Sequence, residues 1–159
     1  MIRKVTENDL INCLEVFHKG YETVAVEFGL TEDNCPDRGR ASLPFDKLLK
    51  EYEDGTDMYC YEINSKIVAF LGMNYTDNKY KLDDIIVLLE YRGKGIGNEL
   101  LKFCKDKANK GGVKEIHLGM IDDNTRLKNW YEKNGFENVE LVNYDGAPFT
   151  VGYMKCILR

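Results

Sequence analysis

Residues 91–98, YRGKGIGN, combine the residue types that hold a phosphate group. Gly93, Gly95 and Gly97 alternate with other residues, Arg92 and Lys94 add positive charge, and a helix-like run begins directly afterwards. Glycines let a phosphate approach the backbone closely, and the free N–H groups and dipole of a helix N-terminus attract an anion. The stretch therefore predicts a diphosphate site, although a tight strand-to-helix turn uses glycines in the same way.

Two well-known phosphate loops do not match these letters. A Walker A loop needs Gly-Lys followed by Ser or Thr, whereas Gly97 is followed by Asn98 and Glu99. A dinucleotide-binding loop needs its third glycine three positions after the second, whereas the glycines here are evenly spaced. The phosphate, if one is bound, belongs to another class of ligand.

The stretch resembles the signature of the GNAT superfamily of acyl-CoA-dependent N-acyltransferases. That signature is Arg or Gln, two free residues, Gly, one free residue, then Gly or Ala, and residues 92–97 satisfy it. The longer segment IIVLLEYRGKGIGNELL is similar to the family's fourth strand, loop and third helix. A second block, NTRLKNWYEKNGF at residues 124–136, follows at the expected distance. The resemblance covers nearly the whole chain, and residues 30–44 are its least typical part.

The resemblance implies acetyl-CoA as the cosubstrate. In the family, the loop amides bind the diphosphate of coenzyme A, and the pantetheine arm lies where the fourth and fifth strands separate. N–H groups near Val87 and Leu88 would then stabilise the charge that develops on the thioester carbonyl. Asn124 is a further implied contact, with a helix cap as its alternative role. The implied cofactor-binding residues are Val87, Leu88, Leu89, Arg92, Gly93, Lys94, Gly95, Ile96, Gly97 and Asn124.

Two side chains are candidates for moving protons. Tyr131 matches the family's general acid, and a phenol with a pKa of about 10 suits a departing thiolate with a pKa of about 8.5. Asp83 aligns with the catalytic glutamate of the family's polyamine acetyltransferases, so it is the predicted base, acting directly, through a water, or only by attracting a cation. A solvated charge at the start of a strand is its alternative role. Strand alternation sends Asp84 to the opposite face.

The predicted reaction is direct transfer of an acetyl group to a primary amine of a small cationic molecule. In the family, the first two helices and the last strands form the acceptor pocket, and acidic and aromatic lining suits a cation. The implied substrate-binding residues are Tyr21, Glu27, Phe28, Asp84 and Tyr144. Two alternatives stay open, namely acetylation of a protein N-terminus or lysine, and an acyl-CoA sensor without turnover.

Covalent catalysis and metal chemistry have little support. Cys104 lies on the apolar stripe of a predicted helix, where a small buried thiol is the common outcome, so a Cys104–His117 pair is not favoured. The five cysteines show no CxxC or CxxH spacing, and the two histidines lack acidic partners at ligand spacing, so no metal is predicted.

Alternating helix and strand periods predict a mixed α/β fold. The resemblance makes this a mostly antiparallel central sheet of six to seven strands with about four helices. Predicted helices span residues 7–21, 45–55, 96–110 and 125–133, and a loop covers residues 26–44. Predicted strands span residues 1–5, 57–63, 66–75, 79–89, 113–120, 136–144 and 149–158.

Length and charge limit the remaining possibilities. A chain of 159 residues suits a single domain spanning residues 1–159. A net charge of −5 argues against nucleic-acid binding, which needs clustered Lys and Arg. No apolar run is long enough to predict a membrane span. The expected protein is cytoplasmic with reduced thiols, and is a monomer or a homodimer.

Overall fold

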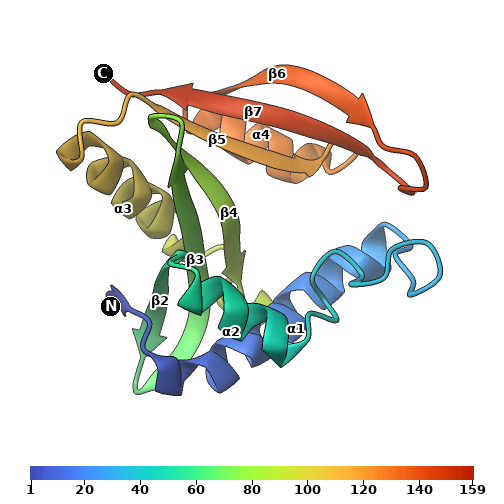
Figure 1. Cartoon of the computed structure of the whole chain (residues 1–159), viewed down its shortest axis with the longest axis horizontal. Helices are drawn as coiled ribbons and strands as arrows, with labels where there is room; N and C mark the ends of the chain where they lie inside the picture. The colour runs from blue at the N-terminus through green and yellow to red at the C-terminus, as the bar shows by residue number, and fades with distance from the viewer.

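A computed structural model describes all 159 residues and contains one sheet of seven strands. The strand order is β1-β2-β3-β4-β5-β7-β6, and four α-helices flank the sheet (Figure 1). The mixed α/β class, the strand number and the helix number predicted from the sequence are confirmed. The strands are β1 (Ile2–Lys4), β2 (Asp57–Ile63), β3 (Lys66–Thr76), β4 (Lys79–Val87), β5 (Glu115–Ile121), β6 (Phe136–Asn143) and β7 (Thr150–Ile157), and the α-helices are α1 (Leu10–Glu27), α2 (Phe45–Glu53), α3 (Ile96–Lys110) and α4 (Thr125–Lys133).

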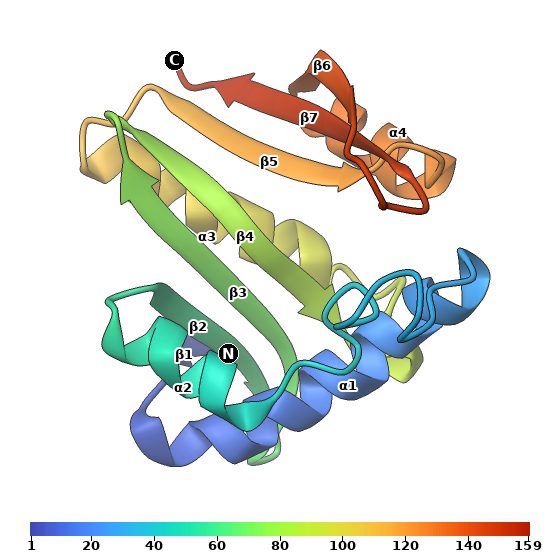
Figure 2. The same ribbon diagram turned by 45° about the vertical axis from the view of Figure 1, so that its right-hand side comes forward.

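The sheet is antiparallel except at the junction of β4 and β5. These two strands run parallel, and they pair only through Tyr80 with Ile116 and Lys81 with His117. Beyond that point they separate, so the two arms of the sheet, β1–β4 and β5–β7–β6, diverge toward the C-terminal ends of β4 and β5 (Figures 1 and 2). The backbone edges of β4 and β5 that face the gap are therefore unpaired, whereas their other edges pair with β3 and β7.

Helices cover both faces of the sheet. Figure 2 shows α1 and α2 in front of the sheet and α3 behind it. Phe17 of α1 packs on Phe70 of β3 with ring centroids 4.7 Å apart, and Phe103 of α3 packs on Tyr59 of β2 at the same separation. These contacts belong to one core of 33 buried residues that reaches from Val5 to Leu158.

The first helix is longer than the sequence predicted. A 3₁₀ turn at Glu7–Asp9 precedes it, with a capping box between Thr6 and Asp9, and the α-helix then runs to Glu27 instead of ending at residue 21. Ala25 extends the buried stripe by packing with Leu30. The helix ends in a Schellman motif, in which Leu30 N–H donates to the Ala25 carbonyl and Gly29 has a φ of 64°.

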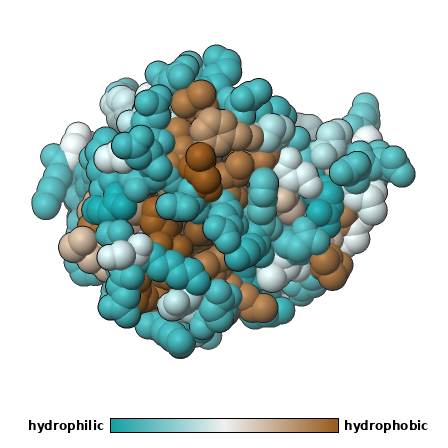
Figure 3. Space-filling view, turned by 90° about the horizontal axis from the view of Figure 1, so that it is seen from below, coloured by the Kyte–Doolittle hydropathy of each residue, from teal (hydrophilic) through white to brown (hydrophobic).

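The surface is mostly hydrophilic. Seen from below, apolar side chains gather in the middle of one face inside a hydrophilic rim (Figure 3). No helix is both long enough and apolar enough to cross a membrane.

Candidate active site

The loop between β4 and α3 presents a row of free backbone N–H groups. Gly93 and Gly95 have φ values of 76° and 87°, and a Cβ atom at either position would meet no atom within 4 Å. The N–H groups from Gly93 to Asn98 have no acceptor in the protein, and we call this segment the amide cradle. Its second half is the first turn of α3, where the helix dipole is positive. The cradle is thus suited to bind an anionic group.

Arg92 does not belong to the amide cradle, contrary to the prediction that its backbone binds the cofactor. Its N–H already donates to the Leu89 carbonyl at 3.2 Å. Its guanidinium donates to the carbonyls of Val87 (2.8 Å) and Gly20 (3.0 Å) and to the Thr23 hydroxyl (3.0 Å). The side chain therefore ties the end of β4 to α1.

The third glycine of the loop has a packing role. Gly97 lies so close to Trp130 of α4 that an added Cβ would stand 3.3 Å from the indole ring. The Trp130 Nε1 donates to Asn98 Oδ1 at 2.8 Å. These contacts hold the N-terminus of α3 against α4, so that the amide cradle has a fixed position relative to the β4–β5 gap.

The strand backbone at the gap offers further polar groups. In the antiparallel β3–β4 ladder, Leu88 N–H donates to the Val68 carbonyl at 3.0 Å, so the N–H groups of Val87 and Ile85 point the other way, toward β5. Leu88 N–H is therefore taken, contrary to the prediction that it polarises a thioester. Leu89 begins a 3₁₀ turn, Leu89–Tyr91, and its side chain is exposed.

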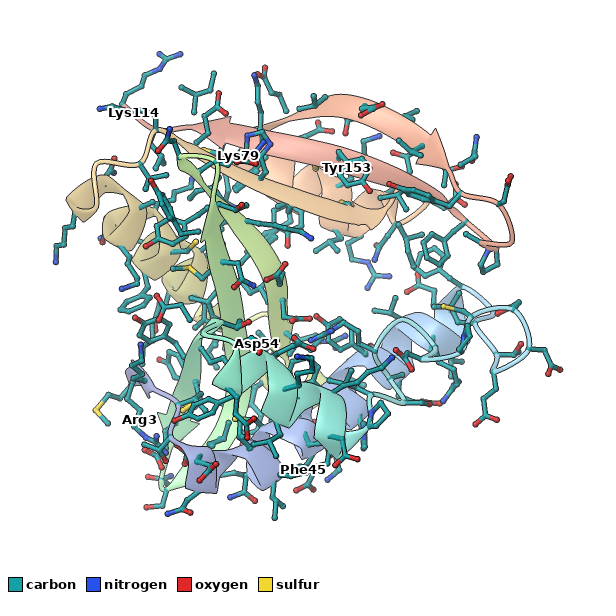
Figure 4. The ribbon with its side chains drawn as sticks, viewed as in Figure 1. Arg3, Phe45, Asp54, Lys79, Lys114 and Tyr153 are labelled. Atoms are coloured by element: carbon teal, nitrogen blue, oxygen red, sulfur yellow. The ribbon has the colours of Figure 1, made fainter.

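A cavity of about 260 Å³ opens between the separated strands. Its walls come from α1, the loop before α2, β4, β5, α4 and β7. Most of its lining is apolar, and the polar side chains come from α1, the loop before α2, β4, and α4 with its cap residue. Tyr153 of β7, labelled on the upper arm in Figure 4, is not part of the lining.

Tyr131 lies in the wall of this cavity. The residue is only 4% exposed, and its side chain belongs to the lining of the cavity. Burial, followed by the nearby Cys104 and Asp84, raises the pKa of Tyr131 well above its ordinary value. The phenol therefore stays protonated at neutral pH and is able to donate a proton into the cavity.

Asp83 and Asp84 both line the cavity but have different surroundings. A β-bulge pairs Gly72 with Asp84 and Met73 with Leu82, so Asp83 is the extra residue and strict alternation fails here. Asp83 accepts a hydrogen bond from Asn74 and lies 3.5 Å from the Lys81 ammonium.

Asp84 is almost fully buried and makes strong contacts. It accepts a hydrogen bond from the Tyr21 hydroxyl at 2.7 Å, and Arg40 reaches both of its oxygens, at 2.8 and 2.9 Å. Burial raises the pKa of Asp84 to about 6, even though Arg40 and Tyr21 act to lower it. Because Arg40 already neutralises the Asp84 carboxylate, a cationic substrate would not find Asp84 as an unpaired anion.

Comparison with known proteins decides the family. The sequence model of the acetyltransferase (GNAT) family matches residues 26–136. The chain belongs to the GNAT family. It is thus an acyl-CoA-dependent transferase whose cosubstrate is acetyl-CoA.

Individual relatives are similar over most of this GNAT chain. It is 30% identical over 148 residues to an uncharacterized N-acetyltransferase of Methanocaldococcus jannaschii, covering 89% of this chain and 62% of that protein. It is 25% identical to the thialysine N-epsilon-acetyltransferase of Bos taurus, over 87% of this chain and 85% of that protein. The crystal structure of PaiA N-acetyltransferase from Thermoplasma acidophilum in complex with coenzyme A matches its fold with a TM-score of 0.76. That match has 21% identity and covers 99% of this chain and 98% of the other.

The site of this GNAT protein suits the cosubstrate of the family. Free N–H groups at a helix N-terminus bind diphosphate, and unpaired strand backbone along the β4–β5 gap suits an extended amide chain such as pantetheine. Asn124 lines the cavity and also caps α4, because its Oδ1 accepts the Leu127 N–H at 3.3 Å. Asn124 thus has the helix-capping role that was the alternative to cofactor binding.

The predicted acceptor residues divide into two groups. Tyr21 and Asp84 line the cavity, whereas Glu27, Phe28 and Tyr144 do not. Glu27 faces outward toward Arg126 at 3.4 Å, and Tyr144 is half exposed with its hydroxyl bonded to that of Tyr153. Glu27 lies outside the cavity because α1 continues past Tyr21 and carries Glu27 beyond it.

Sequence reasoning missed Arg40. It lies in the loop predicted to be the least family-like part of the chain, and it lines the cavity beside Asp84. The sequence signal was the glycine flanked by two arginines in Asp37-Arg38-Gly39-Arg40, but nothing in it names the partners. Cys104 is fully buried, and burial raises the pKa of its thiol to about 12, so it remains an unreactive core residue.

Proposed function

We propose that this GNAT protein transfers an acetyl group from acetyl-CoA directly to a primary amine of a small cationic molecule. The observation that carries the proposal is the cavity itself, whose lining includes Tyr131 of α4 and the two aspartates of β4. At the cavity and among the partners of its lining residues, Arg40 and Lys81 supply two positive charges, against three negative charges on Asp83, Asp84 and Glu51. The resulting excess of negative charge favours a cation.

The roles of the chain's groups follow from this arrangement. The amide cradle binds the diphosphate, and the N–H of Val87 stabilises the developing negative charge on the thioester oxygen. The thioester supplies the activated acetyl group. Tyr131 donates a proton to the departing thiolate, and Asp83 attracts the cationic amine. The amine loses a proton before it attacks the thioester.

The bovine relative supports an amine at the end of a flexible side chain as the acceptor. Its name gives an epsilon amino group as the site of acetylation, and it aligns over 87% of this chain. A side chain of this kind fits a cavity that is mostly apolar and has two aspartates in its lining. We infer that the acceptors of this protein are ω-amines of that class, together with linear polyamines.

A panel of amines tests the proposal. The chain would be incubated with acetyl-CoA and each amine, and release of free thiol would be followed against an amine-free control. The panel should contain thialysine, lysine, linear diamines and polyamines, an aminoglycoside, and peptides with a free N-terminus or an internal lysine. Thiol release with small ω-amines supports the proposal. Release only with peptides would assign a protein-modifying role, and binding of acetyl-CoA without any release would assign a sensor.

A further inference from the structure

Tyr21, Arg40, Asp84 and Glu51 form one connected group of side chains, which we call the Asp84 cluster. Tyr21 donates to Asp84 at 2.7 Å, Arg40 binds both oxygens of Asp84, and the same guanidinium donates to both oxygens of Glu51 at 2.9 and 3.2 Å. Tyr21, Arg40 and Asp84 all line the cavity. The cluster therefore connects the acceptor space to a buried carboxylate through a phenol.

We propose that the Asp84 cluster is a proton relay for the acceptor amine, in which Tyr21 contacts the amine, Asp84 takes the proton and Arg40 positions Asp84. The inference rests on the proposed transfer to an amine and deepens it, because it names the route by which the amine loses its proton. Tyr21 is then a catalytic residue, and Arg40 is a positioning residue.

The relay moves one proton from the amine nitrogen, through the Tyr21 hydroxyl, to Asp84. As the amine nitrogen becomes a nucleophile, one of its N–H bonds breaks and the electron pair stays on nitrogen. The proton passes to the Tyr21 oxygen while the original Tyr21 O–H proton passes to Asp84 Oδ1, along the existing 2.7 Å hydrogen bond. Tyr21 ends as a neutral phenol and Asp84 as a neutral acid. Return of the proton by the same path, to water, resets the cluster.

The charges of the cluster fit this role. Before the reaction, Arg40 carries one positive charge and Asp84 and Glu51 carry two negative charges, so the cluster has a net charge of about −1. After Asp84 takes the proton, Arg40 remains paired with Glu51 and the buried cluster is neutral. A buried ion pair that loses one partner leaves an uncompensated charge at high cost. Glu51 avoids that cost here, because it keeps Arg40 paired.

The loop before α2 holds Arg40 rigidly. Arg38, Gly39 and Arg40 have φ values of 50°, 61° and 76°, a left-handed run that non-glycine residues rarely adopt. Arg38 pairs with Glu22 of α1 at 2.8 and 2.9 Å, which fastens the loop on the other side. The Arg40 guanidinium also lies over the Phe17 ring, 5.0 Å from its centroid. Such strain persists only where the surroundings fix it, and here it directs Arg40 into the cavity.

Burial and the neighbouring charges together set the pKa of Asp84. Burial raises its pKa to about 6, so the carboxylate is mostly ionised at neutral pH and is a stronger base than an exposed aspartate. Removal of the Arg40 charge would raise the pKa further, because Arg40 opposes the effect of burial. The titratable and charged groups that face Asp84 are Tyr21 of α1, Arg40 of the loop, Glu51 of α2, the adjoining Asp83 and Tyr131 of α4.

The first test measures Tyr21→Phe, which keeps the ring and removes the relay oxygen. The best amine from the panel would be used, with kcat/KM measured from pH 5 to 9 and acetyl-CoA affinity measured by calorimetry. We expect kcat/KM to fall about 10²-fold at neutral pH with acetyl-CoA affinity unchanged. A folded variant with at least half of the wild-type kcat/KM would overturn the relay.

The second test uses the pH dependence of kcat/KM to separate a positioning role of Arg40 from a purely structural one. The ratio of each variant's kcat/KM to that of the wild type at the same pH cancels the ionisation of the amine itself. For Arg40→Gln, we expect the acid limb, set by Asp84 near pH 6 in the wild type, to move up by about one pH unit or more. Arg40→Lys, which keeps the charge, should return the limb toward the wild-type position.

Arg38→Gln is the matched control, because it loosens the same loop without touching Asp84. Its acid limb should coincide with that of the wild type. If Arg40→Gln also leaves the limb in place, Arg40 does not position Asp84. If the wild-type protein binds acetyl-CoA but acetylates no amine of the panel, the proposed function fails; an active wild type with unaltered variants defeats the relay alone.

Discussion

At the scale of single residues, the cavity contains a phenol in an unusual state. Tyr131 is buried as a residue, lines the cavity, and has its pKa raised by burial. A phenol with a raised pKa keeps its proton at neutral pH. This state fits a group that gives its proton to the leaving thiolate of the proposed reaction.

We predict that Tyr131→Phe lowers kcat about 10²-fold, because one positioned proton donor is lost. The affinity for acetyl-CoA should stay nearly unchanged, since the amide cradle is not altered. Stopped-time assays of thiol release, together with calorimetric titration of acetyl-CoA, measure the two quantities separately. An unchanged kcat would remove Tyr131 from the mechanism.

The amide cradle makes a second prediction at this scale. Gly95 has a φ of 87°, so Gly95→Ala forces an L-residue into the left-handed region and should cost roughly 1–2 kcal/mol of unfolding free energy. We expect it also to displace the free N–H groups and weaken acetyl-CoA binding at least tenfold, as measured by calorimetry.

The chain supplies a matched control for this change at the other end of the same helix. Gly112 has a φ of 72° and, like Gly95, has no atom within 4 Å of an added Cβ. Gly112→Ala should cause a similar loss of stability while leaving acetyl-CoA affinity unchanged. Equal affinities in both variants would show that the cradle does not hold the diphosphate.

Sequence reasoning worked where a residue acts through its own backbone or through a local pattern. Gly93 and Gly95 indicated the tight turn in which they have positive φ values, and Asn124 indicated a helix cap. Sequence reasoning failed where the role of a residue depends on partners far away in the sequence. Nothing local to Arg40 shows that it meets Asp84, 44 residues away in the sequence.

At the scale of elements, the strand–loop–helix order was predictable because periodicity and turn residues are local signals. The end of α1 was not, since it depends on Ala25 packing with Leu30 and Ala41 of the loop that folds back after the helix. This extension moves Glu27 away from the cavity. The β-bulge at Asp83 was also invisible, because a bulge is a property of two paired strands.

The Arg92 side chain, which connects the end of β4 to α1, leads to a prediction for Arg92→Gln. Arg92 is exposed but donates to Val87, Gly20 and Thr23, so its loss should lower the free energy of unfolding by about 1 kcal/mol. Urea denaturation without acetyl-CoA measures the effect on the fold alone. If the arginine instead served only to bind the cosubstrate, stability would be unchanged and only affinity would fall.

Arg126→Gln is the control for removing a charge near the same helix. Arg126 is 84% exposed in its side chain and makes one 3.4 Å contact with Glu27. Because exposed ion pairs contribute little, we expect a change below about 0.5 kcal/mol. A comparable loss in both variants would mean that charge, and not the three hydrogen bonds, stabilises α1.

At the scale of the whole molecule, the two arms of the sheet share one interior. The core of 33 buried residues includes side chains of β2–β4 and of β5–β7, although the arms pair directly through only two residues of each strand at their junction. Helix α3 bridges the arms, because it contacts both β4 and β5. We therefore propose that residues 1–159 behave as a single domain.

A single domain should unfold in one cooperative step. Trp130, the one tryptophan, reports the contact between α3 and α4 through Gly97 and Asn98, whereas far-UV circular dichroism reports all helices and strands. We predict that urea transitions followed by the two signals coincide. Acetyl-CoA at 100 times its dissociation constant should raise the stability seen by both signals by about 2.7 kcal/mol, because it binds only the folded protein. A fluorescence midpoint below the dichroism midpoint would mean that the β5–β7 arm opens separately, and the cavity between the arms would then be a hinge rather than a fixed site.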